Sequence, residues 1–486
     1  MNVLFVGAEA APFAKVGGMA DFIGSLPAEL RRLGIDARVI LPGYGFIPHD
    51  RYHIHPLFTF PVTLREGAAD VHLYATEHNG VPFYFLQAWP YFGQEDRVYT
   101  DWHWDSPRFI FWNQILLGAI AELRTRLDWP PDALHLNDWH PGLLPFLIRE
   151  NRHLPEWRDI ATLLTIHNIT YQGELVGGWL WQAGIPGRHH PDLAAQNLTD
   201  NMLGIAIAYA DIVTTVSPRY AVEIQYPYMG FGLDGLIRAR AADVYGILNG
   251  IDTTTWNPAT DPLLVSNFDA ANFIEKRPAN KRRLQQEHRL EVRPDTLLVG
   301  MISRLVWQKG IDILLPALRR FLAEAYDAQL VLLGAGEARF EQPLLQLEAD
   351  FNWKARCILQ FDGAAAQHIY AGCDLFLIPS HFEPCGTSQM IAMRYGALPL
   401  ARETGGLVDT VENYDNGDGN YGVGFMFNWE ESAAVLGTLR WARDTFRRRK
   451  DAWLRMQRRA LATDFSWDRS AKQYIELYNK AKSVKA

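Results

Sequence analysis

The chain has 486 residues, 48% of them hydrophobic and 21% charged, so a folded protein of two or three domains is expected. A formal net charge of −8 at pH 7 argues against nucleic acid or an anionic membrane surface as the main partner. No apolar run reaches the roughly 20 residues of a membrane span, and the three cysteines show neither a disulfide framework nor a zinc-binding spacing.

The N-terminal segment predicts the beginning of a parallel sheet. A strand at 3–10 leads into a loop with Lys15, Gly17 and Gly18, and then come a helix and a second strand at 36–44. A GxGxxG dinucleotide fingerprint is missing. One ammonium and two unhindered amides ahead of a helix instead suit a phosphate or diphosphate, although a plain glycine turn with a solvated lysine would look the same.

The next segment, 53–106, alternates polar and apolar residues and predicts extra strands and long loops inserted into the first domain. Tyr99, Trp102 and Trp104 lie here among polar groups. Exposed rings beside hydrogen-bonding side chains suit the faces of sugars, whereas core packing would explain many of the rings equally well.

Polar side chains follow two neighbouring strands after the helix predicted at 109–123. A strand ends at Asp138 and Trp139, and the strand at 161–166 ends at His167. One histidine at such a place is usually a hydrogen-bonded structural residue. Two consecutive strands that both end in this way favour a site at the carboxyl edge of the sheet.

The second half repeats the strand–loop–helix pattern after a stretch at 250–265 that no periodic helix crosses, which predicts a domain boundary there. The loop after one strand carries Arg304 and Lys309. The loop after the strand at 374–378 carries Glu383 and the glycine-led start of a helix. Two cations facing helix amides would hold a diphosphate, with a carboxylate beside the group to be transferred. The alternative is a capped helix with Glu383 solvated on a loop.

Seven motifs stand in order along the chain: KVGG at 15–18, NDWH at 137–140, HNITYQG at 167–173, NGID at 249–252, SRLVWQKG at 303–310, FEPCG at 382–386 and TGGLVDTV at 404–411. Through them the whole chain resembles the bacterial glycogen synthase and plant starch synthase family, and KVGGMAD leans towards the cyanobacterial and plant branch. The resemblance implies an α/β protein of GT-B fold, in which two Rossmann-like, doubly wound parallel-sheet domains face an interdomain cleft. The expected domains are 1–250 on the acceptor side, 251–465 on the donor side, and a C-terminal helix at 466–486 that crosses back to the first domain.

The activity that the resemblance implies is a retaining, metal-independent transfer of glucose from ADP-glucose to the non-reducing end of an α-1,4-glucan, without a cofactor. The family's catalytic positions fall on Glu383, His167, Arg304 and Lys309. The donor-binding positions fall on Lys15, Gly17, Gly18, Asn249, Phe361, Cys385, Gly386, Thr387 and Ser388. The acceptor-binding positions fall on Asp21, Tyr99, Asp138 and Trp139.

Two departures from the family pattern are visible. Thr387-Ser388 replaces the commoner Leu-Thr or Leu-Ile, which puts only the side chain at 387 in doubt because backbone amides bind the phosphate. Ala20 stands where glycine is usual, a small change.

Two other functions stay open at this point. A phosphorolytic enzyme on a similar scaffold would use pyridoxal phosphate, but no lysine lies in a recognisable setting for its Schiff base. A non-catalytic protein that binds glucan or coats granules would leave the cations, glycines and carboxylate without a role. The N-terminus lacks a basic, cleavable leader, so a cytoplasmic location is expected; a plastid location would require a transit peptide already removed, and association with glucan granules is open.

Overall fold

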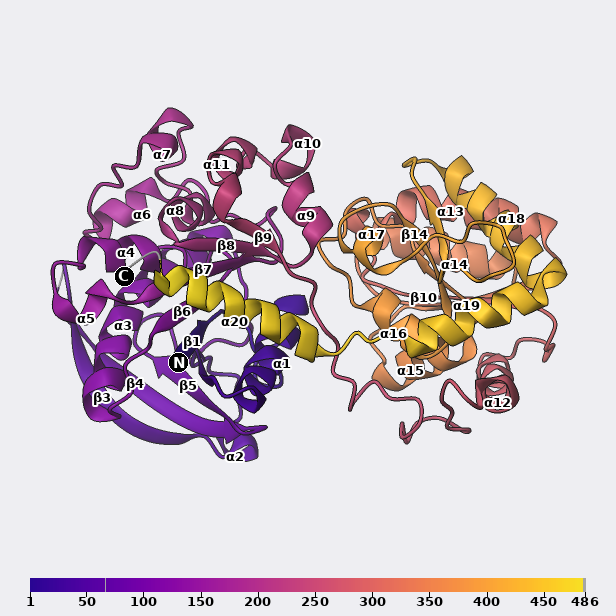
Figure 1. Cartoon of the computed structure of the whole chain (residues 1–486), viewed down its shortest axis with the longest axis horizontal. Coiled ribbons are helices and arrows are strands. Elements are labelled where there is room, and N and C mark those ends of the chain that lie inside the picture. The colour runs from indigo at the N-terminus through magenta and orange to yellow at the C-terminus, as the bar shows by residue number, and fades with distance from the viewer. Residues whose placement is uncertain (66, 484–486) are drawn as a thin grey trace. The chain divides into compact units, whose positions relative to one another are not determined.

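This computed structural model describes residues 1–65 and 67–483, whose internal contacts divide them into two units (Figure 1). The first unit contains Met1–Gly250 and the C-terminal helix α20, Trp467–Ser483. The second unit contains Ile251–Ser466.

The first unit is built on a sheet in the order β3-β4-β5-β2-β1-β6-β7-β8-β9. The seven strands β5, β2, β1, β6, β7, β8 and β9 run parallel to one another, and β3 and β4 form an antiparallel extension beside β5. The hairpin of β3 and β4 is the predicted insertion, and its alternating burial explains the alternating sequence. The strands are β1 Asn2–Val6, β2 Asp36–Pro42, β3 His55–Leu64, β4 Gly67–His78, β5 Val81–Gln87, β6 Ala133–Asn137, β7 Ala161–Ile166, β8 Ile212–Thr215 and β9 Val244–Gly246.

Helices connect these strands and cover the sheet. They are α1 Gly18–Arg32, α2 His49–Tyr52, α3 Trp102–Arg126, α4 Leu144–Glu150, α5 Pro155–Arg158, α6 Gly177–Gln182, α7 Pro191–Ala195, α8 Met202–Tyr209, α9 Pro218–Glu223, α10 Pro227–Gly230 and α11 Asp234–Ala239. Helix α3 begins before the predicted start at 109, because the Asp101 carboxylate accepts the Trp104 N–H and caps the helix there. Trp102 and Trp104 therefore lie on the first turn of a helix and not in a loop.

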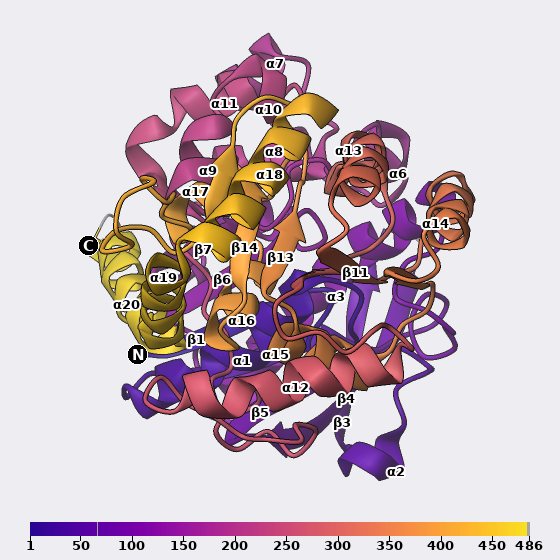
Figure 2. The ribbon, with the colours of Figure 1, turned by 90° about the vertical axis from the view of Figure 1, so that its right-hand side faces the viewer.

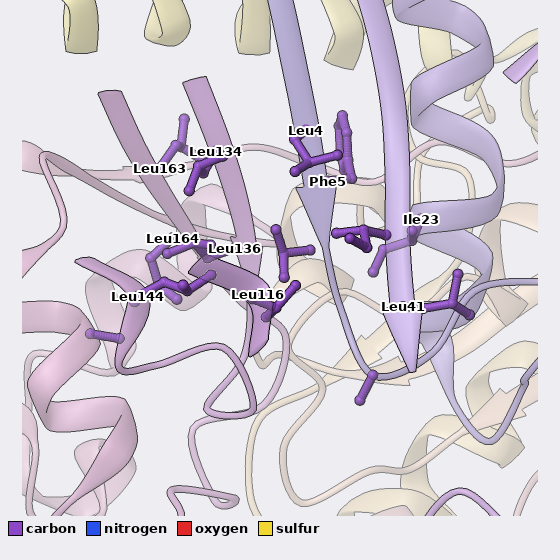
Figure 3. Packing of buried hydrophobic residues seen from close by; sticks show 14 of the residues in the cluster. Leu4, Phe5, Ile23, Leu41, Leu116, Leu134, Leu136, Leu144, Leu163 and Leu164 are labelled. Carbon is purple, nitrogen blue, oxygen red and sulfur yellow. The ribbon is translucent and has the colours of Figure 1, made fainter. Parts of the chain in front are cut away.

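The central strands of the first unit are buried on both faces, which is why they read as continuous apolar runs. Figure 3 shows Leu4, Leu134 and Leu163 from three adjacent strands, with Ile23 of α1 and Leu116 of α3 nearby. Burying such side chains contributes about 1.5–3 kcal/mol each.

Helix α20 packs on α1 and β7 within this unit. The Tyr478 hydroxyl lies 2.6 Å from Nδ1 of the buried His135, and Lys482 forms a 2.6 Å ion pair with Asp132. The last helix is thus tied to the first unit by a buried polar contact as well as by apolar packing.

The second unit contains a fully parallel sheet in the order β12-β11-β10-β13-β14-β15. Its strands are β10 Leu297–Ile302, β11 Ala328–Leu333, β12 Ala355–Ile358, β13 Leu375–Ile378, β14 Leu398–Arg402 and β15 Phe425–Phe427. Its helices are α12 Phe273–Glu287, α13 Ile311–Glu324, α14 Ala338–Asp350, α15 Gly363–Gly372, α16 Ser388–Arg394, α17 Gly406–Thr410, α18 Ser432–Arg448 and α19 Lys450–Ala462. Figure 2 shows α12 lying along α15.

Strand order changes direction between β10 and β13, which are neighbours in the second sheet although they are far apart in sequence. Loops that leave the carboxyl ends of two such strands meet at one edge of the sheet, the usual ligand position in doubly wound folds. These are the loops that carry Lys309 and Glu383.

Candidate active site

Lys309 and Glu383 meet at the switch point of the second unit. Lys309 Nζ donates to Oε1 of Glu383 at 3.0 Å and to Oε2 at 2.7 Å, and the Ser380 hydroxyl donates to Oε2 at 2.9 Å. Glu383 is buried and the Lys309 side chain is 19% exposed. The sequence predicts that Lys309 binds the diphosphate of the donor and that Glu383 lies beside its sugar. In this structure the two side chains are paired with each other.

Glycines let the site loops approach each other. Gly405 has φ +45°, and a Cβ there would lie 2.0 Å from the carbonyl oxygen of Glu383. The next amide, from Gly406, donates to that same oxygen at 3.0 Å. The glycine pair of the TGG motif therefore fixes the backbone that carries Glu383.

We expect Gly405→Ala to lower both activity and stability. A Cβ at 2.0 Å from backbone must push the two loops apart, and alanine at positive φ adds about 1–2 kcal/mol. Turnover should fall by roughly tenfold or more while the circular dichroism spectrum stays unchanged. Gly437→Ala is the matched control, because a Cβ at this helical position meets nothing within 4 Å. Equal activity of the two variants would contradict this role for Gly405.

His381 is a site residue that the sequence did not reveal. Its ring is buried, with Nε2 2.8 Å from Asp312 and Nδ1 3.2 Å from Glu430, and it stacks on Trp307 with ring centroids 4.3 Å apart. Its backbone N–H donates to the Gln308 carbonyl at 2.9 Å. His381 therefore ties the loop before α13 to the loop after β13, which keeps Lys309 opposite Glu383.

The other residues of the second unit that were predicted to bind the donor differ in their exposure. Arg304 is exposed, and no hydrogen bond or ion pair joins its guanidinium to any other residue in 1–65 or 67–483. Phe361 is 97% exposed, immediately before the Asp362 cap of α15. Cys385 is buried, and Gly386 has φ +69°. Thr387 and Ser388 begin the short helix α16.

His167 lies at the carboxyl end of β7 in the first unit, beside the end of β6. Its backbone N–H donates to Asp138 Oδ1 at 2.7 Å, and its Nε2 lies 2.9 Å from Asn137 Oδ1. Burial lowers the pKa of His167 to about 3, so the ring is neutral at physiological pH. A neutral ring that donates from Nε2 to the amide oxygen keeps Nδ1 as an acceptor for a hydroxyl group.

Glu9 is the second residue that the sequence did not reveal. Its carboxylate accepts the Tyr99 hydroxyl at 2.6 Å and the backbone N–H groups of Val16 and Gly17 at 2.7 and 2.8 Å. The Gly17 amide, predicted to face a phosphate, is therefore occupied by Glu9 in this structure. Only a rearrangement of the 15–18 loop would free it for a phosphate.

The remaining predicted residues of the first unit differ in their exposure and in their partners. Lys15 and Asp21 are exposed and form a 2.6 Å ion pair with each other, and Gly18 begins α1. The Trp139 ring is partly buried against His140 and Phe109. Asn249 is buried, and its Oδ1 has no hydrogen-bond partner within the described chain. Such an orphaned amide oxygen is a natural acceptor for a ligand hydroxyl.

Comparison with known proteins decides the family. The model of the starch synthase catalytic domain matches residues 2–239, and that of glycosyl transferases group 1 matches residues 283–422. Glycogen synthase from Streptococcus sanguinis is 41% identical over 98% of this chain and 99% of its own, and that from Geobacillus stearothermophilus is 42% identical over 99% and 98%. The chain belongs to the glycogen synthase family.

Solved structures agree with this glycogen synthase assignment. The catalytic domain of starch synthase IV from Arabidopsis thaliana, bound to ADP and acarbose, matches with a TM-score of 0.88 and 32% identity over 99% of both chains. Sucrose-phosphate synthase from Thermosynechococcus elongatus matches over 99% of both chains at 16% identity and a TM-score of 0.62, which shows the fold alone. The family, the glycosyltransferase class and the GT-B fold predicted from the motifs are confirmed.

Within residues 1–65 and 67–483, no three side chains of His, Cys, Asp or Glu converge as metal ligands would. No helix in the same part of the chain is both long enough and apolar enough to cross a bilayer. The expectation of a reaction without metal or cofactor stays a prediction.

Buried histidines predict an acid-sensitive first unit. Burial lowers the pKa of His140 and of His167 to about 3, and lowers the pKa of His135 well below its ordinary 6.5. The stability that depends on their neutral form is complete above about pH 6.5 and is lost as pH falls towards 3. Burial raises the pKa of Asp138 from 3.8 to about 7, so its contribution runs in the opposite direction, rising as pH falls from 7 to 4.

Between about pH 5.5 and 4, unfolding of the protein therefore protonates the three histidines and deprotonates Asp138, a net uptake of about two protons. The free energy of unfolding should fall by about 3 kcal/mol per pH unit from these four groups. Urea unfolding of the whole protein at pH 5.5, 5 and 4.5 would measure this slope. His140→Gln should reduce the slope by about 1.4 kcal/mol per pH unit, and an unchanged slope would show that His140 is not held neutral.

Proposed function

We propose that the protein transfers glucose from ADP-glucose to the non-reducing end of an α-1,4-glucan, with retention of configuration. The observation that carries this is the pairing of Lys309 with the buried Glu383 at the switch point of the second sheet. It supplies an anion for a developing sugar cation and a cation for a leaving diphosphate. The family's glycogen synthases and the starch synthase bound to ADP and acarbose support these substrates.

On the donor side, Lys309 would exchange its contact with Glu383 for the diphosphate, and Arg304 would bind the same group. The amides of Gly386, Thr387 and Ser388 would add donors. As the C1–oxygen bond to the diphosphate breaks, positive charge develops on the sugar and negative charge on ADP. Glu383 would stabilise the first electrostatically, without a covalent bond to the sugar.

On the acceptor side, the 4-hydroxyl at the glucan end would form the new bond to C1 from the face that ADP leaves. Its proton would pass to the departing phosphate oxygen, so the products are ADP and a glucan longer by one residue. His167 would serve as a neutral hydrogen-bonding group beside the sugar, since its pKa of about 3 removes it as an acid. Tyr99, Asp138 and Trp139 would bind the acceptor.

The other two functions fit these observations less well. In a non-catalytic glucan-binding protein, the largely buried Lys309–Glu383 pair would have no function. Such a pair is not expected there, because burying charges costs free energy. A phosphorolytic enzyme would need pyridoxal phosphate, and an absorbance spectrum of the purified protein distinguishes it directly. We further propose a cytoplasmic location, in keeping with the three free cysteines Cys357, Cys373 and Cys385, which suit a reducing compartment.

A donor-competition assay tests the proposed substrates. Labelled ADP-glucose is offered with a maltooligosaccharide, unlabelled UDP-glucose is added in increasing excess, and product length is read by chromatography. We expect products longer by single glucose units and little competition by UDP-glucose. Strong competition would shift the proposal to a uridine nucleotide, and no elongation with either donor would overturn it.

A further inference from the structure

The first unit contains a large open groove that none of the predicted site residues lines. Its volume is about 1080 Å³. The walls are the start of β4, the loop after β5, one face of α3 and the end of α6. The aromatic lining residues are Trp89, Tyr91, Phe111, Trp179 and Trp181.

Two of these rings are exposed although they are large and apolar. Trp89 is 79% exposed and Trp181 is 69% exposed, so neither contributes much to the core. Trp181 is nevertheless held in place: the Arg65 guanidinium lies 4.7 Å from its ring centroid and donates to its backbone carbonyl at 2.6 Å. Rigid, exposed rings that the fold does not need are typical of binding surfaces.

The polar lining indicates the class of ligand. Arg65 and Asp70 supply one charge of each sign, and Gln114 and Gln182 supply amides. A groove without excess charge does not suit a nucleotide or an acidic polymer, which would need several cations. Tryptophan faces beside amides suit a neutral chain of sugar rings, which offers C–H groups to the ring faces and hydroxyls to the amides.

The groove adjoins the segment that carries a predicted acceptor residue. On the first turn of α3, Trp102 packs on Trp179 with ring centroids 4.5 Å apart, and Trp104 packs on Tyr91 at 5.2 Å. Tyr99, whose hydroxyl bonds Glu9, lies three residues before Trp102. One short stretch of chain therefore connects the groove with the Glu9–Tyr99 pair in the same unit.

We propose that this groove is a second, non-catalytic binding site for the α-1,4-glucan. The inference rests on the proposed function and adds how the polymer is held. A branched or long glucan that is held in the groove presents its other ends at a raised effective concentration. The groove therefore lowers KM for a polymeric acceptor and leaves KM for a short oligosaccharide unchanged. The groove thus determines preference for acceptor size.

The test compares Trp89→Ala/Trp181→Ala with the wild type. Trp353→Ala is the matched control, because Trp353 is an exposed tryptophan, at 62%, that does not line the groove. Initial rates are measured with glycogen and with maltotriose, and migration is measured in native gels that contain glycogen. We expect KM for glycogen to rise roughly tenfold in the double variant, with kcat, KM for maltotriose and KM for ADP-glucose unchanged, and migration in the glycogen gel to be less retarded.

The two proposals fail in different ways. If all variants elongate maltotriose and the double variant keeps the wild-type KM for glycogen and the wild-type retardation, the groove does not bind glucan and the proposed function stands. If no variant elongates any acceptor, the proposed function fails, and the glycogen gel alone decides the groove. Should the double variant unfold, Trp181→Ala alone provides the same comparison, with a smaller expected rise in KM for glycogen.

Discussion

Glu383→Ala should lose on the order of 10²-fold or more in turnover while it still binds ADP. The carboxylate is buried and fixed by Lys309 and Ser380, so it is already oriented when positive charge develops on the sugar. A preorganised charge costs no rearrangement at the moment of reaction, which is why its removal affects turnover more than binding. Initial rates with saturating ADP-glucose and glucan, and calorimetric titration with ADP, would measure the two effects.

A control variant separates the charge of Glu383 from its shape. Glu383→Gln keeps the size of the side chain and should lose nearly as much activity as the alanine variant. Because Lys309 is mostly buried and would lose its counter-ion in either variant, ADP should raise their melting temperatures more than that of the wild type. Near-normal turnover of Glu383→Ala would remove Glu383 from the chemistry.

Lys309→Gln should impair both donor binding and turnover, by roughly 10- to 100-fold in KM for ADP-glucose. The variant removes a cation from the diphosphate and leaves the buried Glu383 carboxylate with Ser380 as its one side-chain donor among the described residues. The protein without nucleotide should therefore also be less stable, because an uncompensated buried charge is costly. Steady-state kinetics and thermal unfolding, each on the same preparation, would show the paired effect.

Arg304→Gln is the matched control for Lys309→Gln. Its guanidinium is exposed and forms no hydrogen bond or ion pair with any other described residue, so its loss should raise KM for the donor without changing stability. If Arg304→Gln destabilises the protein as much as Lys309→Gln does, the stability loss in Lys309→Gln does not come from leaving Glu383 as an unpaired buried charge. If neither variant changes KM for the donor, the diphosphate is bound elsewhere.

The sheets and the positions of the site loops could be predicted because buried parallel strands leave a local signal. Apolar runs end where polar loops begin, as at His167 after β7 and Glu383 after β13. The predicted start of α3 is too late, because the aromatic-rich sequence before residue 109 resembles a loop. It does not reveal that the Trp104 N–H donates to the Asp101 carboxylate, which caps the helix.

The contacts that position the site could not be predicted, because they join residues far apart in the chain. Glu9 meets Tyr99 across 90 positions, and His381 meets Asp312 across 69. A glutamate or a histidine in a loop has no periodic signal of its own. Only the folded backbone shows that Glu9 holds the 15–18 loop or that His381 joins two loops of the second unit.

One measurement tests the central claim most directly: proton NMR of the product formed from ADP-glucose and a maltooligosaccharide, with ADP quantified in the same tube. The account predicts one ADP for each glucose transferred and a new α-1,4 linkage at the non-reducing end. A β-linked product, or ADP release with free glucose and no longer chain, would contradict it.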